Sequence, residues 1–366
     1  MNVKKSLRNS FSVVNPNQVS YMIFYVTNRC NFRCNFCFYS DEIEKGLKPN
    51  EMSVEEIRKF APTIGPLVQL SMTGGEPFLR KEFKEIAGIL LEETDARWVT
   101  IPTNASLTNK MVSFLEEILP RFPDTYFRLT FSIEGIGEVH DNLRSMPGSF
   151  KKIRRSYDAI SPLRAKFSNL VLDCNSVFTA SSENYLLDTV KSLNQSFNFD
   201  NMSVTYARGK IKDENLKNVS KERYKLINDF LEAREKNKEK RFLYPLWRGV
   251  NSVTRENLMR TVFDDEYVSS CVAGRKLLVV SETGTVMPCE ILGKSIGNLR
   301  NHDWNLSKLL KENNVSVMQK WIKKTKCKCS FECALAANVV WKPKNYPKVA
   351  ISAIKNLGKS TIDHNK

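Results

Sequence analysis

The chain has 366 residues, of which 42% are hydrophobic, and a formal net charge of +16 from 56 basic and 40 acidic residues. This composition excludes extended disorder, collagen-like chains and coiled coils, and it allows a large packed core. At about 150 residues per domain, the length predicts two domains or one large barrel with an attachment. The chain has nine cysteines and only three histidines, which indicates that its chemistry depends on thiolates.

The sequence contains no segment that indicates a membrane span or a secretion signal. No stretch approaches about 20 consecutive apolar residues, and residues Met1 to Asn15 are basic and polar, without an apolar core. We therefore expect a cytoplasmic, reducing environment. In that environment, clustered cysteines bind metals or take part in catalysis more often than they form disulfides.

From residue 20 onward, β-rich apolar runs alternate with amphipathic segments. The runs are nearly continuous in β-branched and aromatic residues, which is typical of strands buried on both faces of a parallel sheet. Strands are predicted at Tyr21–Val26, Val68–Met72, Trp98–Ile101, Tyr126–Ile133, Leu170–Phe178 and Met202–Tyr206. Helices are predicted at Val54–Ile64, Glu82–Glu93, Lys110–Leu119, Phe150–Ile160 and Tyr185–Leu193. Ser53 and Glu56 form a capping box for the first helix.

Six strand–helix repeats predict a parallel α/β sheet, but periodicity alone does not separate an open sheet from an incomplete barrel. The pattern changes after residue 210. The charge-rich segment Lys221–Glu239 is predicted to be a solvated helix. Farther along, Lys276–Ser281 and Thr285–Pro288 flank a turn and predict a hairpin.

Cys30, Cys34 and Cys37 form a C-x3-C-x2-C motif directly after the first predicted strand. Three thiolates on one loop can bind three irons of a [4Fe–4S] cluster and leave the fourth iron open to an external ligand. The alternative is a zinc site, but zinc prefers four ligands, usually as two separated C-x2-C pairs. We interpret the motif as the site of an open cluster.

The segment Thr73–Pro77 reads T-G-G-E-P and closes the second predicted strand. Its two glycines let the backbone approach a ligand closely, and the Glu76 carboxylate can accept hydrogen bonds from an ammonium group. Such sheets bind ligands at the carboxyl ends of their strands. We therefore expect this turn and the cysteine loop to form one site.

These motifs resemble those of the radical S-adenosylmethionine (radical SAM) superfamily. The resemblance rests on C-N-F-R-C-N-F-C at residues 30–37 and G-G-E-P at residues 74–77, in the expected order and strands. Further matches are T-N at residues 103–104, S-I-E-G at 132–135 and H-D-x-x-R at 140–144. The similar region covers roughly residues 20–210.

The resemblance implies that Cys30, Cys34 and Cys37 hold a [4Fe–4S] cluster whose open iron binds the methionine part of S-adenosylmethionine (SAM). An electron from the reduced cluster would break the S–C5′ bond, and the 5′-deoxyadenosyl radical would remove a hydrogen atom from the substrate. The electron would come from a one-electron reductant such as flavodoxin or ferredoxin.

The resemblance also implies contacts for each part of SAM. These are Phe36 for the adenine, Gly74, Gly75 and Glu76 for the methionine ammonium group, Ser132, Glu134 and Asn175 for the ribose, and Arg144 for the carboxylate. Arg208 is an alternative partner for the carboxylate. Many relatives carry Asp in place of Glu134.

Five more cysteines lie toward the C-terminal end. They are Cys271 and Cys289, which flank the predicted hairpin, and Cys327, Cys329 and Cys333, which form C-x-C-x3-C. This pattern resembles the SPASM or twitch extension of radical SAM enzymes and implies an auxiliary [4Fe–4S] cluster. A full SPASM unit has seven or eight cysteines and two clusters, so five cysteines imply one cluster and a spare residue. A zinc ribbon is the alternative.

Two residues with reactive side chains have simpler interpretations. Cys174 lies in a predicted strand and is interpreted as a buried apolar residue. Its alternative role, by resemblance to some radical epimerases, is to donate a hydrogen atom to a substrate radical. His140 is interpreted as a loop residue that orients its neighbours, with a general base as the alternative.

The positive charge suits phosphate-bearing substrates, nucleic acid or an anionic membrane. It is concentrated at Lys320–Lys328 and Lys342–Lys366. In this tail, Val349–Leu357 has apolar residues at helical spacing, so it packs on the protein or lies on a membrane surface. No RNA-binding motif accompanies the charge. The sequence therefore gives no firm signal for a nucleic-acid partner, and a weak contact of the tail with an anionic membrane surface is a further expectation.

Together these features predict an α/β fold, an incomplete (β/α)6 TIM-like barrel with a small C-terminal α+β auxiliary iron–sulfur domain. The predicted divisions are a lead-in (1–19), a radical SAM core (20–210), a helical linker (211–264), a SPASM/twitch-like domain (265–340) and a basic tail (341–366). The predicted activity is radical SAM chemistry on a phosphate-bearing sugar or lipid-linked molecule. The alternatives are ribosomal peptide modification, which the short lead-in disfavours, a zinc-bearing nucleic-acid-binding protein and a non-catalytic iron–sulfur scaffold.

Overall fold

The computed structural model describes residue 15 and residues 18–45, 50–236 and 244–357. Within these residues, one sheet holds strands in the order β6-β5-β4-β3-β2-β1-β7-β8-β9. Strands β1 to β6 are parallel to their neighbours, β7 is parallel to β1, and β8 and β9 are antiparallel additions. The strands are β1 (Tyr21–Thr27), β2 (Gln69–Gly74), β3 (Trp98–Thr103), β4 (Tyr126–Ser132), β5 (Leu170–Phe178), β6 (Asn201–Tyr206), β7 (Leu277–Val280), β8 (Thr285–Met287) and β9 (Gly297–Asn298).

Helices follow most strands and continue through the C-terminal part. The α-helices are α2 (Ser40–Lys45), α3 (Val54–Phe60), α4 (Phe83–Thr94), α5 (Thr108–Arg121), α6 (Glu138–Leu143), α7 (Ser149–Ile160), α8 (Leu163–Lys166), α9 (Leu186–Ser196), α10 (Lys221–Lys236), α11 (Tyr244–Val262), α12 (Leu306–Leu309), α13 (Asn313–Lys324), α14 (Glu332–Val340) and α15 (Tyr346–Leu357). Short 3₁₀ helices are η1 (Ala61–Thr63), η2 (Pro77–Leu79), η3 (Glu214–Lys217), η4 (Leu299–His302) and η5 (Pro343–Asn345).

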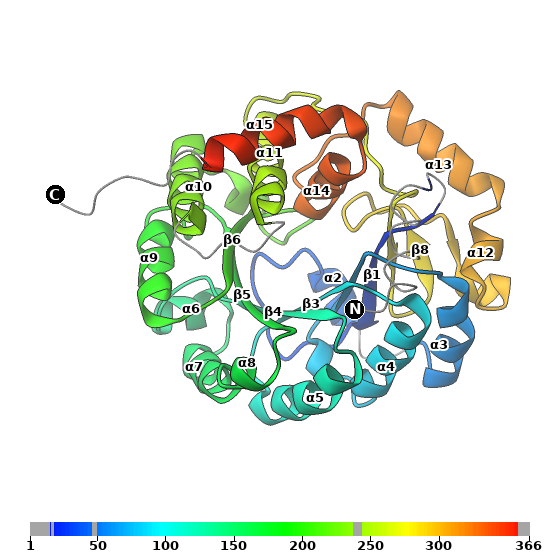
Figure 1. The fold of residues 1–366 in the computed structure, drawn as a ribbon, viewed down its shortest axis with the longest axis horizontal. Coiled ribbons are helices and arrows are strands. Elements are labelled where there is room, and N and C mark those ends of the chain that lie inside the picture. Colours follow the sequence, from blue (N-terminus) through cyan, green and yellow to red (C-terminus); the bar gives the residue numbers. More distant parts are fainter. Residues whose placement is uncertain (1–14, 16–17, 46–49, 237–243, 358–366) are drawn as a thin grey trace.

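The parallel strands form an open curve, with α4, α5, α7 and α9 on its outer side (Figure 1). Strands β6 and β9 are the two edges and do not pair with each other, so the barrel is incomplete, as predicted. The predicted capping box is also present. The Ser53 hydroxyl accepts from the Glu56 amide at 3.2 Å, and the Glu56 carboxylate accepts from the Ser53 amide at 2.8 Å.

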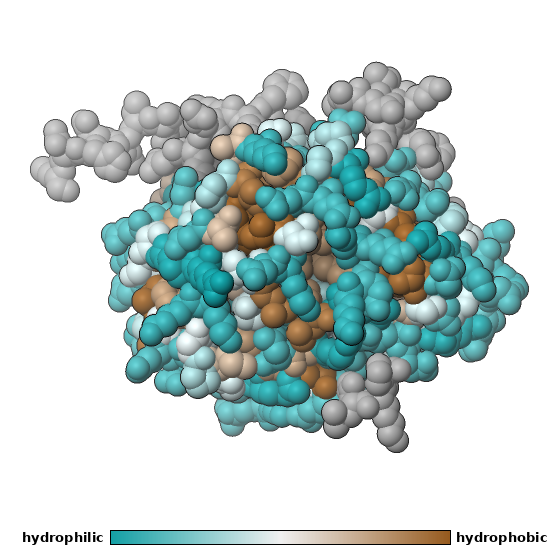
Figure 2. Space-filling model, turned by 90° about the horizontal axis from the view of Figure 1, so that it is seen from below, coloured by the Kyte–Doolittle hydropathy of each residue, from teal (hydrophilic) through white to brown (hydrophobic). Residues whose placement is uncertain are grey.

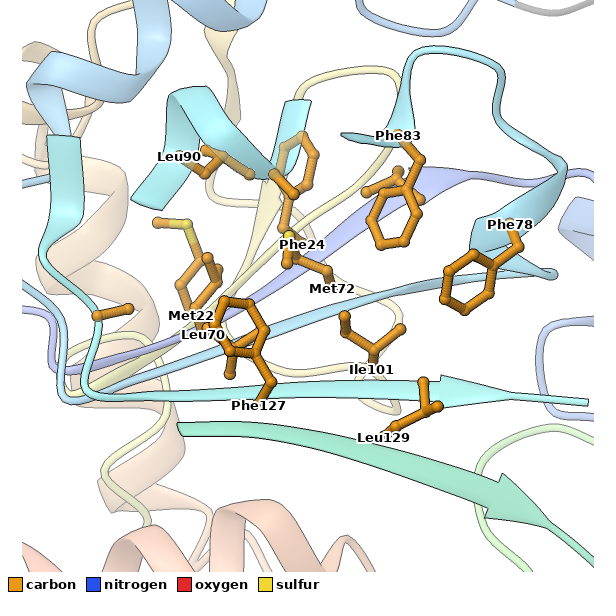
Figure 3. Close-up of a cluster of buried hydrophobic side chains, with 14 of the residues drawn as sticks. Met22, Phe24, Leu70, Met72, Phe78, Phe83, Leu90, Ile101, Phe127 and Leu129 are labelled. Carbon is orange, nitrogen blue, oxygen red and sulfur yellow. The ribbon is translucent and has the colours of Figure 1, made fainter. Parts of the chain in front are cut away.

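The layer between the sheet and the outer helices is the main apolar core. Figure 3 shows buried side chains of four adjacent strands beside those of η2 and α4. The labelled residues are Met22, Phe24, Leu70, Met72, Phe78, Phe83, Leu90, Ile101, Phe127 and Leu129. Each buried side chain of this size contributes about 1.5–3 kcal/mol. This layer therefore fixes the strands whose carboxyl ends carry the sequence motifs.

Helix α10 is less solvated than its sequence predicted. Tyr224, Ile227 and Leu231 are each only 1% exposed. These residues recur at helical spacing, so they form an apolar stripe under a surface of charged residues. The predicted helix is present and its charged residues Glu222, Arg223, Lys225 and Asp229 are exposed, but the prediction did not include the buried stripe. Its last predicted residues, 237–239, lie outside the described residues.

The predicted hairpin is present as β7 and β8, which pair antiparallel. The sequence did not show that β7 also pairs parallel to β1, with Tyr21 opposite Leu277 and Phe24 opposite Val280. All four residues of β7 are buried. The segment between Cys271 and Cys289 therefore continues the sheet of the barrel.

Helix α15 packs against α11, and Val349 and Ala353 are buried between them. Gly249 permits this approach, because a Cβ at that position would come within 2.5 Å of the Val349 carbonyl oxygen. The opposite side of α15 exposes Ile351 and Ile354 by 54% and 65%. The rest of the predicted tail (residues 358–366) and residues 1–14, 16 and 17 of the lead-in lie outside the described residues.

Apolar side chains reach the surface only in places. The face shown in Figure 2 is mainly hydrophilic and carries separate apolar patches. Among the described residues, no helix combines the length and the apolar character that a transmembrane span requires.

Candidate radical SAM site

A cavity of about 220 Å³ lies at the carboxyl ends of strands β1 to β6. Each of these strands, or the residues directly after it, contributes to the wall. Examples are Tyr25 of β1, Thr73 of β2, Thr103 of β3, Ser132 of β4, Val177 of β5 and Thr205 of β6. The cavity thus occupies the edge at which parallel α/β sheets bind ligands.

Cys30, Cys34 and Cys37 all line this cavity from the loop after β1. Burial raises the pKa of the Cys30 thiol to about 12. Burial also raises the pKa of Cys34 to about 11, although the neighbouring Arg144 opposes this change. Both thiols are therefore protonated at neutral pH, and a metal that binds them must displace protons.

The Gly74–Gly75 turn packs directly against the cysteine loop. The amide of Gly75 donates to the Thr27 carbonyl at 3.0 Å, and the amide of Glu76 donates to the Arg29 carbonyl at 2.8 Å. A Cβ at Gly75 would come within 2.2 Å of the Arg29 oxygen and 2.8 Å of the Cys30 Cβ. Only glycine fits this position, and the structure thereby brings the turn and the loop to one site.

The Glu76 carboxylate lies beneath the cavity wall and does not line the cavity. It is buried and accepts hydrogen bonds from the Thr103 hydroxyl at 2.9 Å and from the amides of Asn104 and Phe78 at 2.7 and 3.2 Å. Burial raises the pKa of Glu76 to about 7, and these hydrogen bonds oppose the rise. Its predicted contact with an ammonium group stays a prediction.

Glu134 and Arg144 form a buried ion pair at the cavity wall. The Glu134 carboxylate accepts from Nε and Nη2 of Arg144 at 2.5 and 2.7 Å. The third nitrogen of Arg144, Nη1, lies 3.7 Å from the Cys34 sulfur, and the guanidinium lies 5.3 Å from the Phe36 ring centre. Arg144 and Phe36 line the cavity, whereas Glu134 lies behind Arg144. The predicted ribose residues Ser132 and Asn175 also line it.

His140 and Cys174 lie outside the cavity wall. The His140 ring is buried, its Nδ1 accepts from the Glu134 amide at 3.2 Å, and burial lowers its pKa to about 4. The neutral ring thus supports the backbone of its neighbour, in agreement with the orienting interpretation. The prediction that His140 lies in a loop was wrong, because it belongs to helix α6. Cys174 is 1% exposed within the apolar core, whereas the next residue, Asn175, faces the cavity. Cys174 is therefore a core residue and is not placed to reach a substrate in this cavity.

Four of the five C-terminal cysteines, Cys271, Cys289, Cys329 and Cys333, pack in the cluster that includes Tyr21, Ile23 and Tyr25 of β1. Burial raises the pKa of Cys289 and Cys329 to about 12, and the neighbouring thiols of Cys271 and Cys327 contribute to this rise, so these four thiols lie near one another. The four are Cys271, Cys289, Cys327 and Cys329. Cys333 instead has Arg208, Glu290 and Tyr21 as its main electrostatic neighbours.

The residues present fit an iron–sulfur cluster and SAM in the first cavity. Three thiols of one loop share a cavity with hydroxyl and amide side chains, and the Gly74–Gly75 turn that packs against this loop also lines the cavity. Within the described part of the chain, no three His, Cys, Asp or Glu side chains converge as a single metal ion requires. A [4Fe–4S] cluster places each thiolate on a different iron, so its ligands need not converge on one point.

Comparison with known proteins agrees with this geometry. Residues 24–173 match the model of the radical SAM superfamily. The match supports the radical SAM superfamily for this region of the chain. A GTP 3′,8-cyclase of Pasteurella multocida is 27% identical over 138 residues, which are 36% of this chain and 41% of that protein. The GTP 3′,8-cyclase of Campylobacter lari is 31% identical over 101 residues, or 27% and 31% of the two chains. The chain thus matches well under half the length of these curated relatives.

Solved structures extend the likeness of fold to most of the chain. The structure of anSMEcpe with bound AdoMet and Cp18Cys peptide has a TM-score of 0.58 and 16% identity, and it covers 92% of this chain and 99% of its own. Streptococcus suis SuiB bound to S-adenosylmethionine has a TM-score of 0.53 and 16% identity over 83% and 66% of the two chains. The radical SAM family implies a [4Fe–4S] cluster and SAM as cofactors.

Proposed function

We propose that this chain is a radical SAM enzyme in which Cys30, Cys34 and Cys37 hold a [4Fe–4S] cluster beside SAM. The observation that carries the proposal is the convergence of these thiols and the Gly74–Gly75 turn on one cavity at the sheet edge. When bound, the cluster and SAM supply a 5′-deoxyadenosyl radical that takes a hydrogen atom from an unactivated C–H bond.

The residues around the cavity have roles that follow from their positions. Phe36 offers a ring face for the adenine, and Ser132 and Asn175 offer polar groups for the ribose. The Gly74–Gly75 backbone forms part of the cavity wall. Glu76 supplies negative charge for the methionine ammonium group. Glu134 fixes two nitrogens of Arg144, so Nη1 of Arg144 is left to contact the cofactor carboxylate. Glu134 therefore acts through Arg144 more than on the ribose.

The C-terminal cysteines are proposed to hold one auxiliary [4Fe–4S] cluster. Their closeness to one another and to β1 supports this proposal. Full ligation by four thiolates leaves no open iron, so the cluster would transfer electrons or stabilise the fold. A flavodoxin or ferredoxin would supply the first electron.

For the substrate, we propose a phosphate-bearing sugar or lipid-linked molecule. Four cationic side chains line the cavity, those of Arg33, Arg144, Arg208 and Lys212. Arg144, Arg208 and Lys212 pair with Glu134, Glu290 and Glu44, whereas Arg33 forms no ion pair among the described residues. A cavity with this excess of positive charge favours an anionic ligand. The names of the curated relatives, which refer to GTP, agree with a phosphate-bearing substrate.

Peptide modification is the second candidate. It is favoured by the likeness of fold to anSMEcpe, whose structure contains a peptide. It is disfavoured by the positive cavity, unless the peptide is acidic.

The proposed location is the cytoplasm, with a weak contact between the tail and an anionic membrane surface. Ile351 and Ile354 are exposed on α15, and Lys344 and Lys348 are exposed nearby in the sequence. An apolar face bordered by lysines suits an anionic lipid surface.

Anaerobic purification and incubation with SAM and a strong reductant test the proposal. We expect an iron-containing protein that releases 5′-deoxyadenosine, and we expect Cys34→Ala to abolish this product. A zinc-containing, iron-free protein would instead support the zinc-bearing alternative. Fully loaded clusters without 5′-deoxyadenosine would support the non-catalytic scaffold. Cys174→Ala is the matched control, because it removes a thiol outside the cavity.

A further inference from the structure

Arg208 occupies a central position between the two groups of cysteines. It follows β6 by two residues, and its guanidinium lies 4.7 Å from the Phe38 ring centre and 5.0 Å from that of Phe331. Phe38 directly follows Cys37, and Phe331 lies two residues before Cys333. Arg208 thus lies between segments that carry cysteines of both groups.

The guanidinium of Arg208 is only partly used by the protein. Its Nη2 donates to the Glu290 carboxylate at 3.0 Å, and that carboxylate also accepts from the Tyr25 hydroxyl at 2.7 Å. Within the described part of the chain, the buried Nε of Arg208 has no hydrogen-bond partner. An arginine has five N–H donors, and a buried donor without a partner costs about 1–3 kcal/mol. Such a donor indicates a place for an acceptor that comes with a ligand.

The cavity is the direction from which this ligand can arrive. Arg208, Tyr25 and Glu290 all line the cavity, and the Arg208 side chain keeps 20% of its surface exposed. The rings of Phe38 and Phe331 hold the guanidinium between them and limit its movement. A planar, pre-oriented guanidinium matches the geometry of phosphate and carboxylate groups.

We propose that Arg208 anchors the substrate by binding its oxyanion, a phosphate group in the first instance, in competition with Glu290. This inference rests on the proposed function, because it names a substrate contact within the same cavity. It differs from a role in cofactor binding, in which Arg208 would contact the SAM carboxylate. It predicts that replacement of Arg208 weakens binding of the ligand and that replacement of Glu290 strengthens it, because Glu290 occupies donors that the ligand needs.

The test measures binding of inorganic pyrophosphate by calorimetry to the anaerobic, cluster-loaded protein saturated with S-adenosylhomocysteine. Four proteins are compared, namely the natural chain, Arg208→Gln, Glu290→Gln and the control Lys210→Gln. Lys210 pairs with Asp41 on the surface and does not line the cavity. The control thus removes one positive charge two residues away from Arg208 without changing the cavity wall. Citrate replaces pyrophosphate in a second series, to distinguish a carboxylate from a phosphate.

We expect Arg208→Gln to weaken pyrophosphate binding about tenfold, which is about 1.4 kcal/mol. Glu290→Gln should tighten it about threefold, and Lys210→Gln should leave it within about twofold. Affinity for S-adenosylhomocysteine should be the same in all four proteins. If Arg208→Gln weakens the binding of citrate but not that of pyrophosphate, the anchor is supported and the substrate oxyanion is a carboxylate.

Other outcomes would overturn the proposal. Equal pyrophosphate affinity in Arg208→Gln and the natural chain would exclude the anchor. A tenfold loss of S-adenosylhomocysteine affinity in Arg208→Gln would assign this residue to the cofactor instead. Weakened binding in Glu290→Gln would show that the ion pair acts only as a structural unit. Release of 5′-deoxyadenosine, measured in parallel, reports on the proposed function separately, since the binding assay requires no turnover.

Discussion

Replacement of Glu134 by Gln tests whether the buried ion pair at the cavity wall stabilises the fold. Both oxygens of Glu134 accept from the Arg144 guanidinium, Glu134 is fully buried, and the Arg144 side chain is 12% exposed. The Glu134→Gln variant keeps the shape of the side chain and removes its charge. Arg144 would then remain as a nearly buried cation without a counter-ion.

The expected cost is about 3 kcal/mol in the free energy of unfolding. Breaking a buried pair by removal of one partner costs about 3–5 kcal/mol, because the remaining charge is left without compensation. We take the lower end, since Arg144 is not completely buried and an amide oxygen still accepts one hydrogen bond. Urea unfolding of the anaerobic protein, followed by far-ultraviolet circular dichroism, measures this change.

The control is Glu138→Gln, which removes an exposed carboxylate from the first turn of α6. It should change stability by less than about 0.5 kcal/mol. The double variant Glu134→Leu with Arg144→Met should cost less than Glu134→Gln alone, because it leaves no buried charge. A Glu134→Gln cost below about 1 kcal/mol, or a double variant that costs more than the single one, would refute this reasoning.

Three further predictions concern packing and protonation. Gly75→Ala places a Cβ 2.2 Å from the Arg29 carbonyl oxygen, so iron bound per chain after anaerobic reconstitution should fall by at least half, and full iron content would contradict the packing argument. Cys174→Ala should keep its iron and its release of 5′-deoxyadenosine, and a loss of that product would restore a chemical role for this thiol. The carbonyl of Asn298 and the Glu312 carboxylate raise the pKa of His302. Protonated His302 therefore stabilises the fold fully below pH about 6.5, and this contribution is lost as pH rises through the raised pKa. Glu312→Gln should accordingly destabilise the protein by about 0.5 kcal/mol at pH 5.5 and by less at pH 9, and a pH-independent difference in thermal denaturation would contradict this assignment.

The strands and the cysteine site could be predicted because their signals are local. Each of β1 to β6 is a short run of β-branched and aromatic residues, and the structure places each within two residues of its predicted bounds. The motif at residues 30–37 needs no long-range information, because one loop holds all three thiols. The Gly-Gly turn could be placed beside it because parallel strands end at the same edge.

The remaining features depend on contacts that the local sequence does not specify. The four residues of β7 are equally suited to any sheet edge, and nothing in them selects β1 as the partner. Glu290 could not be identified from its position beside Cys289, since its importance depends on hydrogen bonds with Arg208 and Tyr25, which are distant in the sequence. Glu134 was predicted to contact the ribose, but its position behind Arg144 depends on α6 turning back toward β4.

Strand β1 connects the two cysteine groups through its alternation of side chains. Met22 and Phe24 point into the core beneath the outer helices, whereas Tyr21 and Tyr25 pack among the C-terminal cysteines. The same strand ends in the loop of Cys30. One strand therefore contacts both groups, and the cavity that holds the first group is lined by Tyr25, by the cysteine loop and by Glu290, which follows Cys289. A substrate in this cavity would contact residues next to both groups, so variants of Tyr25 should affect substrate affinity and the environment of the C-terminal cysteines together.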